Sequence, residues 1–247
     1  MVNEQTIEKL MSMGLREMAK EFRAQMQDNA VKNMSFDDRF GFLVENQWQH
    51  RRNNRINNLH KHAGFKFPQA TMEAVDYDPG RDLNRDLLLE LSQGKYIRDK
   101  RNILIMGPAG AGKTFLSNAL GVAACRRLYK VLYIRMPELL VDIQIAAADG
   151  RYKAVLESFC KPDVLILDEW MHQPISSEQA GSIFEIIESR HMEASTIFVA
   201  QSKPAGWHGQ INNKVLADAI LDRIVNNCYD IEISDKVNMR ERMGFRG

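Results

Sequence analysis

A glycine-rich segment near the middle of the chain constrains its fold more than any other feature of the sequence. The residues of this segment follow one another in the order Gly107, Pro108, Ala109, Gly110, Ala111, Gly112, Lys113 and Thr114. They fit the P-loop pattern, in which a glycine and four further residues precede Gly-Lys-Ser/Thr. An apolar run at 103–106 precedes the segment, and a helical pattern at 113–128 follows its last glycine. The sequence therefore predicts a strand, a phosphate-binding loop and a helix in immediate succession.

Each part of this loop has an expected role toward a bound nucleotide. Glycines let backbone N–H groups turn inward around phosphates, and the following helix offers the positive end of its dipole. We expect Lys113 to bridge the β- and γ-phosphates of ATP and the Thr114 hydroxyl to hold Mg²⁺. The expected nucleotide-binding set extends to Phe115. A glycine-rich turn of purely structural use is the alternative, which the complete pattern between a strand and a helix disfavours.

Two acids follow a second apolar run. Asp168 and Glu169 come directly after the run at 164–167, and ligands of open α/β sheets bind at the carboxyl ends of the strands. We expect Asp168 to position Mg²⁺ and Glu169 to orient or deprotonate the attacking water, which suits hydrolysis of ATP rather than transfer to an acceptor. An acidic pair that caps the next helix is the alternative. The separate strand, 55 residues after Lys113 (168 − 113), disfavours it.

Apolar runs and helical patterns alternate from residue 102 onward, which is typical of an α/β fold with a parallel sheet flanked by helices. The expected strands are 103–106, 131–134, 164–167, 196–200 and 229–233, and the expected helices are 113–128, 137–148 with a second helix to 159, 176–192 and 217–225. Residues 1–65 show only helical spacing, which Gly64 and Pro68 then break. We therefore expect a small helical N-terminal domain, 1–65, and an α/β domain, 66–247.

Two apolar stripes define the expected N-terminal helices. The first stripe consists of Ile7, Leu10, Met11, Leu15, Met18 and Phe22. The second helix is expected to begin at Ser35, which with Asp38 resembles a capping box with the shorter acid. Its stripe consists of Phe36, Phe40, Leu43, Val44 and Trp48.

The overall composition is that of an ordinary soluble globular protein. Lys and Arg number 33 against 32 Asp and Glu, a net charge of +1, and 45% of the 247 residues are hydrophobic. This composition excludes disorder and a disulfide scaffold. Cys125, Cys160 and Cys228 are far apart, which indicates a reducing, cytoplasmic setting. We expect no membrane partner, because no apolar run approaches the roughly 18 residues of a membrane span.

Positive charge is concentrated in one part of the chain. No acid occurs between Glu45 and Glu73, and the basic residues of this stretch are Arg51, Arg52, Arg55, Lys61 and Lys66. Such a helix face suits the phosphate backbone of double-stranded DNA, whose counterions Lys and Arg release. A solvated helix surface, or one that docks an acidic partner, is the alternative. A second candidate for DNA contact is the pair Arg151 and Lys153, near the turn at Asp149-Gly150.

Two further polar residues are candidates because of their places in the α/β domain. Gln201 follows the expected strand at 196–200 and would emerge at the same sheet edge as Asp168, whereas a turn-capping glutamine is the alternative. Arg223 lies in an amphipathic helix and could reach the ATP of a neighbouring subunit as an arginine finger. A surface salt bridge is its alternative.

Taken together, these motifs resemble those of AAA+ ATPases, and more closely the IstB-like transposition helper ATPases of bacterial insertion sequences, relatives of the DnaC helicase loaders. Beyond the P-loop, the resemblance rests on the segments 13–19, 35–40, 195–201, 207–208 and 217–223. It implies an AAA+ core with ATP and Mg²⁺, Gln201 at the sensor-I position and Arg223 as the arginine finger. It also implies ATP-dependent assembly of a homo-oligomer on DNA, with a cognate transposase as partner in the bacterial cytoplasm.

The resemblance leaves three points open. Only 24 residues follow Arg223 (247 − 223), which predicts a truncated or absent lid. Arg240 or Arg242 then either replaces the sensor-II residue or belongs to a solvated basic tail. The adenine pocket is expected somewhere between Phe65 and Ile97.

The predicted function is an ATP-dependent, DNA-binding regulator of transposition that helps a transposase to select or remodel target DNA. A replicative helicase loader of the DnaC type is the nearest alternative, because the ATPase core would be the same. A small-molecule P-loop kinase would need an acceptor pocket, and Glu169 disfavours it. A purely structural DNA-binding module is the last alternative.

Overall fold

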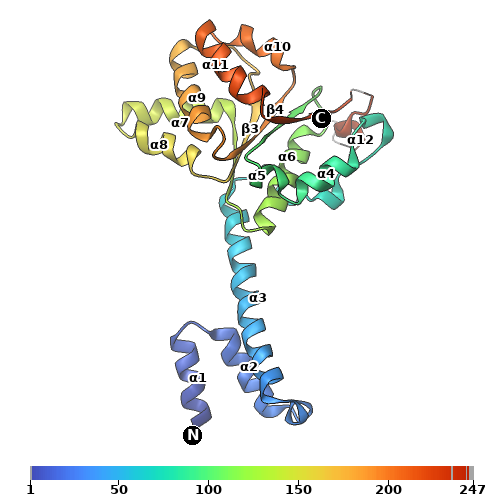
Figure 1. Cartoon of the computed structure of the whole chain (residues 1–247), viewed down its shortest axis with the longest axis vertical. Helices are drawn as coiled ribbons and strands as arrows, with labels where there is room; N and C mark the ends of the chain where they lie inside the picture. The colour runs from blue at the N-terminus through green and yellow to red at the C-terminus, as the bar shows by residue number, and fades with distance from the viewer. Residues whose placement is uncertain (1, 235, 243, 245–247) are drawn as a thin grey trace. The chain divides into compact units, whose positions relative to one another are not determined.

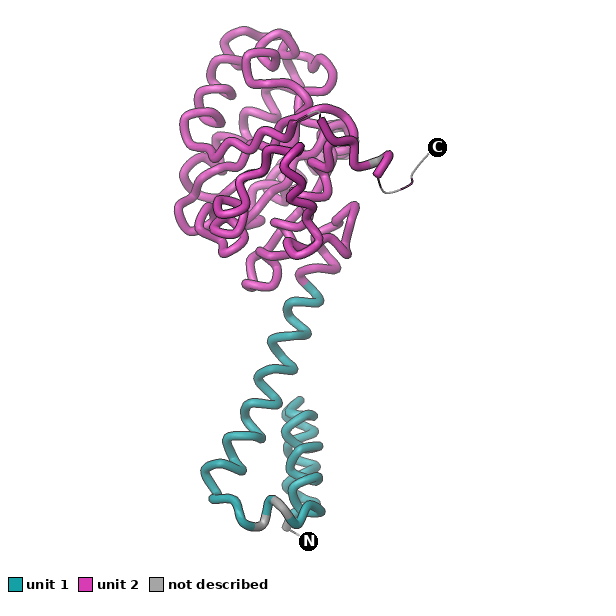
Figure 2. The backbone as a smooth tube through the Cα atoms, turned by 90° about the vertical axis from the view of Figure 1, so that its right-hand side faces the viewer, with its two compact units in different colours: residues 1–58 teal, residues 59–247 magenta. Residues whose placement is uncertain are grey.

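The computed structural model describes residues 2–234, 236–242 and 244, with only the backbone of residues 2, 30, 32 and 240. The chain forms two compact units, Met1–Asn58 and Leu59–Gly247 (Figure 2). This division lies inside the helix α3 (Phe36–His62), whereas the sequence expectation placed the domain boundary at residue 65. Separate functions for the two parts stay a prediction.

The N-terminal unit consists of α1 (Val2–Ser12), α2 (Arg16–Gln27), the short 3₁₀ turn η1 (Ala30–Asn33) and most of α3. The expectation of one continuous apolar stripe over 7–22 is wrong, because Gly14 adopts a left-handed φ of 72° and separates α1 from α2. The N–H of Leu15 closes this helix end by donating to Leu10 O at 2.8 Å. The expected cap of α3 is confirmed, since Asp38 N donates to Ser35 Oγ at 3.2 Å.

The expected apolar stripe of α3 is only partly buried. Leu43 is buried, whereas the side chains of Phe36, Phe40, Val44 and Trp48 are exposed. Successive residues at a spacing of four are rotated by about 40° around the helix axis. A row with this spacing therefore turns away from any single neighbouring helix. Helix α2 contacts α3 largely through polar groups: the side chain of Gln47 accepts a hydrogen bond from the N–H of Met18, and Asn46 donates to Glu21 at 2.8 Å.

The second unit is built on a five-stranded parallel sheet in the order β2-β3-β4-β1-β5. Its strands are β1 (Asn102–Met106), β2 (Val131–Arg135), β3 (Val164–Trp170), β4 (Ser195–Ala200) and β5 (Cys228–Glu232). All five expected strands are confirmed. They were recognisable because both faces of a covered parallel sheet are buried, which makes its strands continuous apolar runs.

Helices cover both faces of the sheet. One face packs on α4 (Arg85–Ser92), α5 (Lys95–Arg98) and α6 (Lys113–Arg126). The other face packs on α7 (Met136–Ala148), α8 (Tyr152–Cys160), α9 (Ser177–Arg190) and α11 (Lys214–Val225). Figure 1 shows these two layers on opposite sides of the strands. Successive residues of a strand pack on opposite layers. On β1, Ile103 and Ile105 pack in the core beneath α6, whereas Leu104 and Met106 pack in the core on the other face.

Short elements complete this unit. They are η2 (Met72–Ala74), η3 (Pro79–Arg81), α10 (Pro204–Trp207), η4 (His208–Gln210) and α12 (Met239–Arg242). Among the residues that the structure describes, α12 is the only helix after β5. No helix in the described part of the chain is both long and apolar enough to cross a membrane.

Candidate functional site

The P-loop connects β1 to α6, and its glycines adopt conformations that other residues rarely reach. Gly110 and Gly112 have φ values of 82° and 85°. A Cβ atom on Gly107 would lie 2.6 Å from Ile233 O, and one on Gly110 would lie 2.5 Å from Asn238 Oδ1. The glycines are therefore required by the backbone conformation and by the segment after β5, which crosses the loop closely.

Lys113 folds back over the loop that precedes it. Its ammonium group donates to Gly107 O and Pro108 O, both at 2.7 Å. The residue is buried although it carries a charge, and backbone carbonyls of the loop solvate that charge. The lysine cation is thus held inside the loop that the sequence assigns to phosphates.

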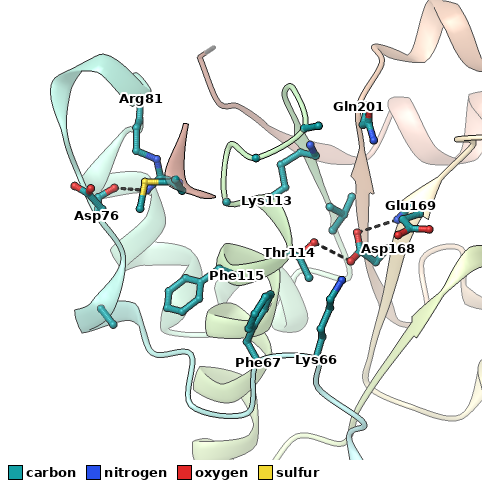
Figure 3. Close-up of a pocket in the computed structure, with 16 residues that line it drawn as sticks. Lys66, Phe67, Asp76, Arg81, Lys113, Thr114, Phe115, Asp168, Glu169 and Gln201 are labelled. Carbon is teal, nitrogen blue, oxygen red and sulfur yellow. Dashed lines mark hydrogen bonds between the residues drawn. The ribbon is translucent and has the colours of Figure 1, made fainter. Parts of the chain in front are cut away.

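Asp168 is the most firmly held carboxylate of the site. Its Oδ2 accepts hydrogen bonds from Thr114 Oγ1 and from Tyr133 Oη, each at 2.8 Å, and its Oδ1 accepts one from Glu169 N at 2.8 Å. Asp168 is 3% exposed, so these donors replace the water that an ionised carboxylate needs. Figure 3 shows Thr114 and Asp168 facing each other across the site. A hydroxyl and a carboxylate are oxygen donors of the kind that suits Mg²⁺.

Glu169 leaves the regular strand although β3 continues to Trp170. In β3, Leu167 pairs with Phe198 and Trp170 with Ala200, so that one extra residue forms a bulge. Glu169 has a φ of 57°, a conformation that is uncommon outside glycine. Adjacent strand residues normally point to opposite faces. The bulge removes that constraint, and both Asp168 and Glu169 line the same pocket.

Glu169 is held by an arginine that no sequence motif indicated. Arg135, at the end of β2, donates from Nη2 to Glu169 Oε2 at 2.6 Å and from Nη1 to Glu138 Oε1 at 3.1 Å. The hydrogen bond and charge of Arg135 lower the pKa of Glu169 below its ordinary value. The candidate base therefore stays ionised at neutral pH and is paired with a cation.

A cavity of about 220 Å³ joins the two motifs (Figure 3). From the expected set it is lined by Ala109, Gly110, Gly112, Lys113, Thr114, Phe115, Asp168, Glu169 and Gln201. The parallel strands bring Gln201 to the same sheet edge as Asp168, as the sequence predicted. Figure 3 also shows Lys66 pointing toward Thr114 and Asp168. In the sequence, Lys66 had stood only as one of the charges of the basic stretch.

The segment before β1 forms the remaining wall of the cavity. It contributes Lys66, Phe67, Ala74, Asp76 and Arg81, which lie in the range expected to hold the adenine pocket. Phe67 is fixed to α6, because its N–H donates to Asn118 Oδ1 at 2.8 Å. The guanidinium of Arg81 is buried and donates to Asp76 O and, at 2.8 Å, to Ala111 O. Arg81 thus ties this wall directly to the P-loop.

Arg223 does not line the cavity of its own chain. It extends from α11 toward α9, where it pairs with Glu188 and lies 4.9 Å from the ring centroid of Phe184. It also donates to Ala219 O at 3.0 Å. Any contact between Arg223 and a nucleotide would require a second subunit, and the arginine-finger role stays a prediction.

The candidate DNA contacts also stay predictions. Arg51, Arg52 and Arg55 are exposed on α3, and the guanidinium of Arg52 lies 5.4 Å from the ring centroid of Trp48. Lys61 is exposed near the end of α3. Arg151 immediately precedes α8 and Lys153 lies in its first turn, and both are exposed. Arg151 pairs with Asp149 at 2.8 Å.

The tail also departs from expectation. Arg242 is not simply solvated, because it forms ion pairs with Asp76 and Asp78 at 2.8 and 2.6 Å. The side chain of Arg240 lies outside the described residues. Met239 lines the cavity, although nothing in the sequence around it indicated a part in the site.

Comparisons with known proteins identify the family and the fold. A family model described as IstB-like ATP binding protein matches residues 8–244. An insertion sequence ATP-binding protein of Sinorhizobium fredii is 36% identical over 234 residues, which cover 95% of this chain and 95% of that protein.

Two solved structures share the fold of the second unit. The AMPPCP-bound DnaA of Aquifex aeolicus matches with a TM-score of 0.59 and 21% identity, over 71% of this chain and 53% of that one. The DnaC helicase loader matches with a TM-score of 0.59 and 15% identity, over 67% of this chain and 97% of that one. At these identities the likeness shows the fold alone, which is that of an AAA+ P-loop protein.

The resemblance noted from the sequence is thereby confirmed, and the chain is an ATPase of the AAA+ type. The family model spans nearly all of its residues, and the Sinorhizobium protein is similar along almost its whole length. This chain therefore belongs to the family of IstB-like ATP-binding proteins.

Proposed function

We propose that this protein is an ATP-dependent, DNA-binding regulator of transposition that assembles into a homo-oligomer and assists a cognate transposase in choosing or remodelling target DNA. The observation that carries the proposal is its membership of a family whose relatives are named as insertion sequence ATP-binding proteins. A bacterial cytoplasmic setting is in keeping with Cys125, Cys160 and Cys228, which are all free thiols.

The proposed chemistry is hydrolysis of ATP by water. Thr114 and Asp168 would hold Mg²⁺ together with the phosphates, and the ion would neutralise charge that develops on them. Lys113 would exchange its two loop carbonyls for phosphate oxygens, which are better partners for its charge. Glu169 would accept a proton from the attacking water, and Gln201 would orient that water or the terminal phosphate.

The proposed DNA contacts are four basic residues of α3, Arg51, Arg52, Arg55 and Lys61. Arg51, Arg52 and Arg55 are exposed, and the chain has no acid from residue 46 to residue 72 that would oppose their charge. Such contacts recognise the phosphate backbone rather than base sequence. The net charge of +1 for the whole chain does not weigh against this, because a local cluster determines the nearby potential.

Charge reversal on α3 tests the DNA role. We expect R51E/R52E/R55E to weaken binding to a DNA duplex and to reduce the slope of log affinity against log salt by about 0.9 for each lost phosphate contact. The matched control is K9E/R16E/R23E, which changes the same charge at exposed positions of the same unit. Binding should be measured by fluorescence anisotropy with ATP present, over a range of salt concentrations.

Equal losses in the two triple variants, or an unchanged salt slope, would contradict the assignment of α3. The partner is tested separately by purification from a host that carries the insertion sequence. We expect the tagged protein to retain a transposase in the presence of ATP and DNA. Recovery of a hexameric helicase in its place would favour a helicase loader.

A further inference from the structure

The segment after β5 crosses the nucleotide site and contacts two of its walls. Met239 N donates to Gly110 O at 3.0 Å, which fixes the start of α12 on the P-loop. The side-chain amide of Asn238 packs on the same glycine, whose Cβ position would lie 2.5 Å from Asn238 Oδ1. Met239 itself lines the cavity that contains Lys113 and Asp168. We call residues 238–242 the C-terminal strap.

The far end of the strap is attached to the opposite wall by one arginine. Arg242 Nη1 lies 2.8 Å from Asp76 Oδ2, and its Nη2 lies 2.6 Å from Asp78 Oδ2. Asp76 also lines the cavity. The two acids are themselves fixed, since Asp78 N donates to Asp76 Oδ1 and Gly80 N donates to Asp78 Oδ1. Arg242 therefore binds two carboxylates whose positions are already fixed by backbone hydrogen bonds.

We propose that the C-terminal strap retains the bound nucleotide, and that the two ion pairs of Arg242 with Asp76 and Asp78, here called the fork, set the rate at which the nucleotide leaves. One end of the strap lies on the phosphate loop and the other on the wall formed by the segment before β1. A nucleotide in the cavity is therefore bounded by Met239 and by the bridge that Arg242 makes. This inference rests on nucleotide binding and is independent of the proposed DNA role.

The strength of the attachment suits a strap that opens repeatedly. Half of the Arg242 side chain is exposed, at 49%, and Asp76 and Asp78 are 34% and 26% exposed. Exposed ion pairs are weak and are screened by salt. The pairs should therefore slow nucleotide release by a modest factor, and this factor should shrink as the ionic strength rises.

Release of a fluorescent ADP from the full-length protein tests the strap. The labelled nucleotide is displaced by excess ATP in a stopped-flow instrument, without DNA. We expect R242Q to release it about 2- to 30-fold faster, which is the range for the loss of two exposed ion pairs. The rate for R242Q should also depend less on salt than that of the natural protein. Binding stoichiometry and circular dichroism check that each variant is folded.

Two further variants separate the fork from a general charge effect. K236Q removes one positive charge from the same part of the chain, and it should release nucleotide at the same rate as the unsubstituted protein. D78N removes one carboxylate of the fork but keeps the oxygen that accepts from Gly80, and D78N/R242Q should be no faster than R242Q alone. An unchanged rate in R242Q would overturn the proposal, and so would equal acceleration in K236Q. A failure of the DNA role would change neither measurement.

Discussion

Replacement of tyrosine by phenylalanine should have opposite effects on stability at two buried positions, Tyr133 and Tyr96. Tyr133 Oη donates to Asp168 Oδ2 at 2.8 Å, and Tyr133 is 7% exposed. Tyr96 is 1% exposed, and its hydroxyl is buried without a hydrogen-bond partner among the described residues. Tyr→Phe removes one oxygen in each case. Only at Tyr133 does the change take a donor away from a buried carboxylate.

The expected magnitudes follow from the two environments. A hydrogen bond to a charged group contributes about 1.5–3 kcal/mol, so that Y133F should lower the free energy of unfolding by this amount. For a unit of this size, the melting temperature should fall by about 2–4 °C for each kcal/mol. A buried hydroxyl without a partner costs about 1–3 kcal/mol. Y96F should therefore leave stability unchanged or raise it.

Urea unfolding followed by circular dichroism measures both effects, and the dependence of ATP hydrolysis on Mg²⁺ concentration gives a functional readout. We expect Y133F to need more Mg²⁺ for half-maximal rate, because Asp168 loses one of its three donors. Y96F should show the natural dependence. Equal stability of Y133F and Y96F, or a smaller loss in Y133F than in Y96F, would refute the claim that Tyr133 supports the Asp168 carboxylate.

Three other substitutions probe the charges of the site. R135A should raise the pKa of Glu169 toward its ordinary value of 4.5 and so move the acid limb of the kcat–pH profile upward; an unmoved limb contradicts the pairing. The stabilisation from this pair is present above that ordinary pKa and is lost as the pH falls through the lowered one. K66M should lower kcat/KM for ATP about 10-fold through loss of a charged contact, whereas the exposed K130M should not. E188Q should release Arg223 and strengthen ATP-dependent assembly in light scattering, and unchanged assembly would count against the finger.

The sequence was sufficient for the architecture because the relevant signals are local. Strands covered on both faces are apolar throughout, as at 103–106 and 164–167, and the P-loop pattern marks the strand-to-helix turn by itself. Parallel pairing then places Asp168 and Gln201 at one edge without any knowledge of side-chain contacts. Gly14 was also a readable signal, since a glycine within a helical pattern is a common helix end.

The residues that were missed depend on strand order or on distant segments. Tyr133 and Arg135 reach Asp168 and Glu169 because β2 lies beside β3, and no spacing in the sequence states that order. Arg242 and Asp76 are 166 positions apart, and their contact requires the segment after β5 to return across the P-loop. The bulge in β3 likewise depends on pairing with β4, and it lets two neighbouring acids share one pocket.

The charged groups of the site divide into a fixed set and an exchangeable set. Asp168 is buried and accepts three hydrogen bonds, so that moving it would leave the carboxylate and its donors without partners. Lys113 is also buried, but its ammonium group can turn from the loop carbonyls to phosphate oxygens while the loop stays in place. Arg135, Arg223 and Arg242 instead pair with Glu169, Glu188 and the two aspartates through contacts that are partly exposed. Exposed ion pairs of this kind are weak, so that a phosphate or a neighbouring subunit can replace them. Changes of state in this ATPase should therefore proceed by exchange of arginine partners around a P-loop and an Asp168 that stay in place.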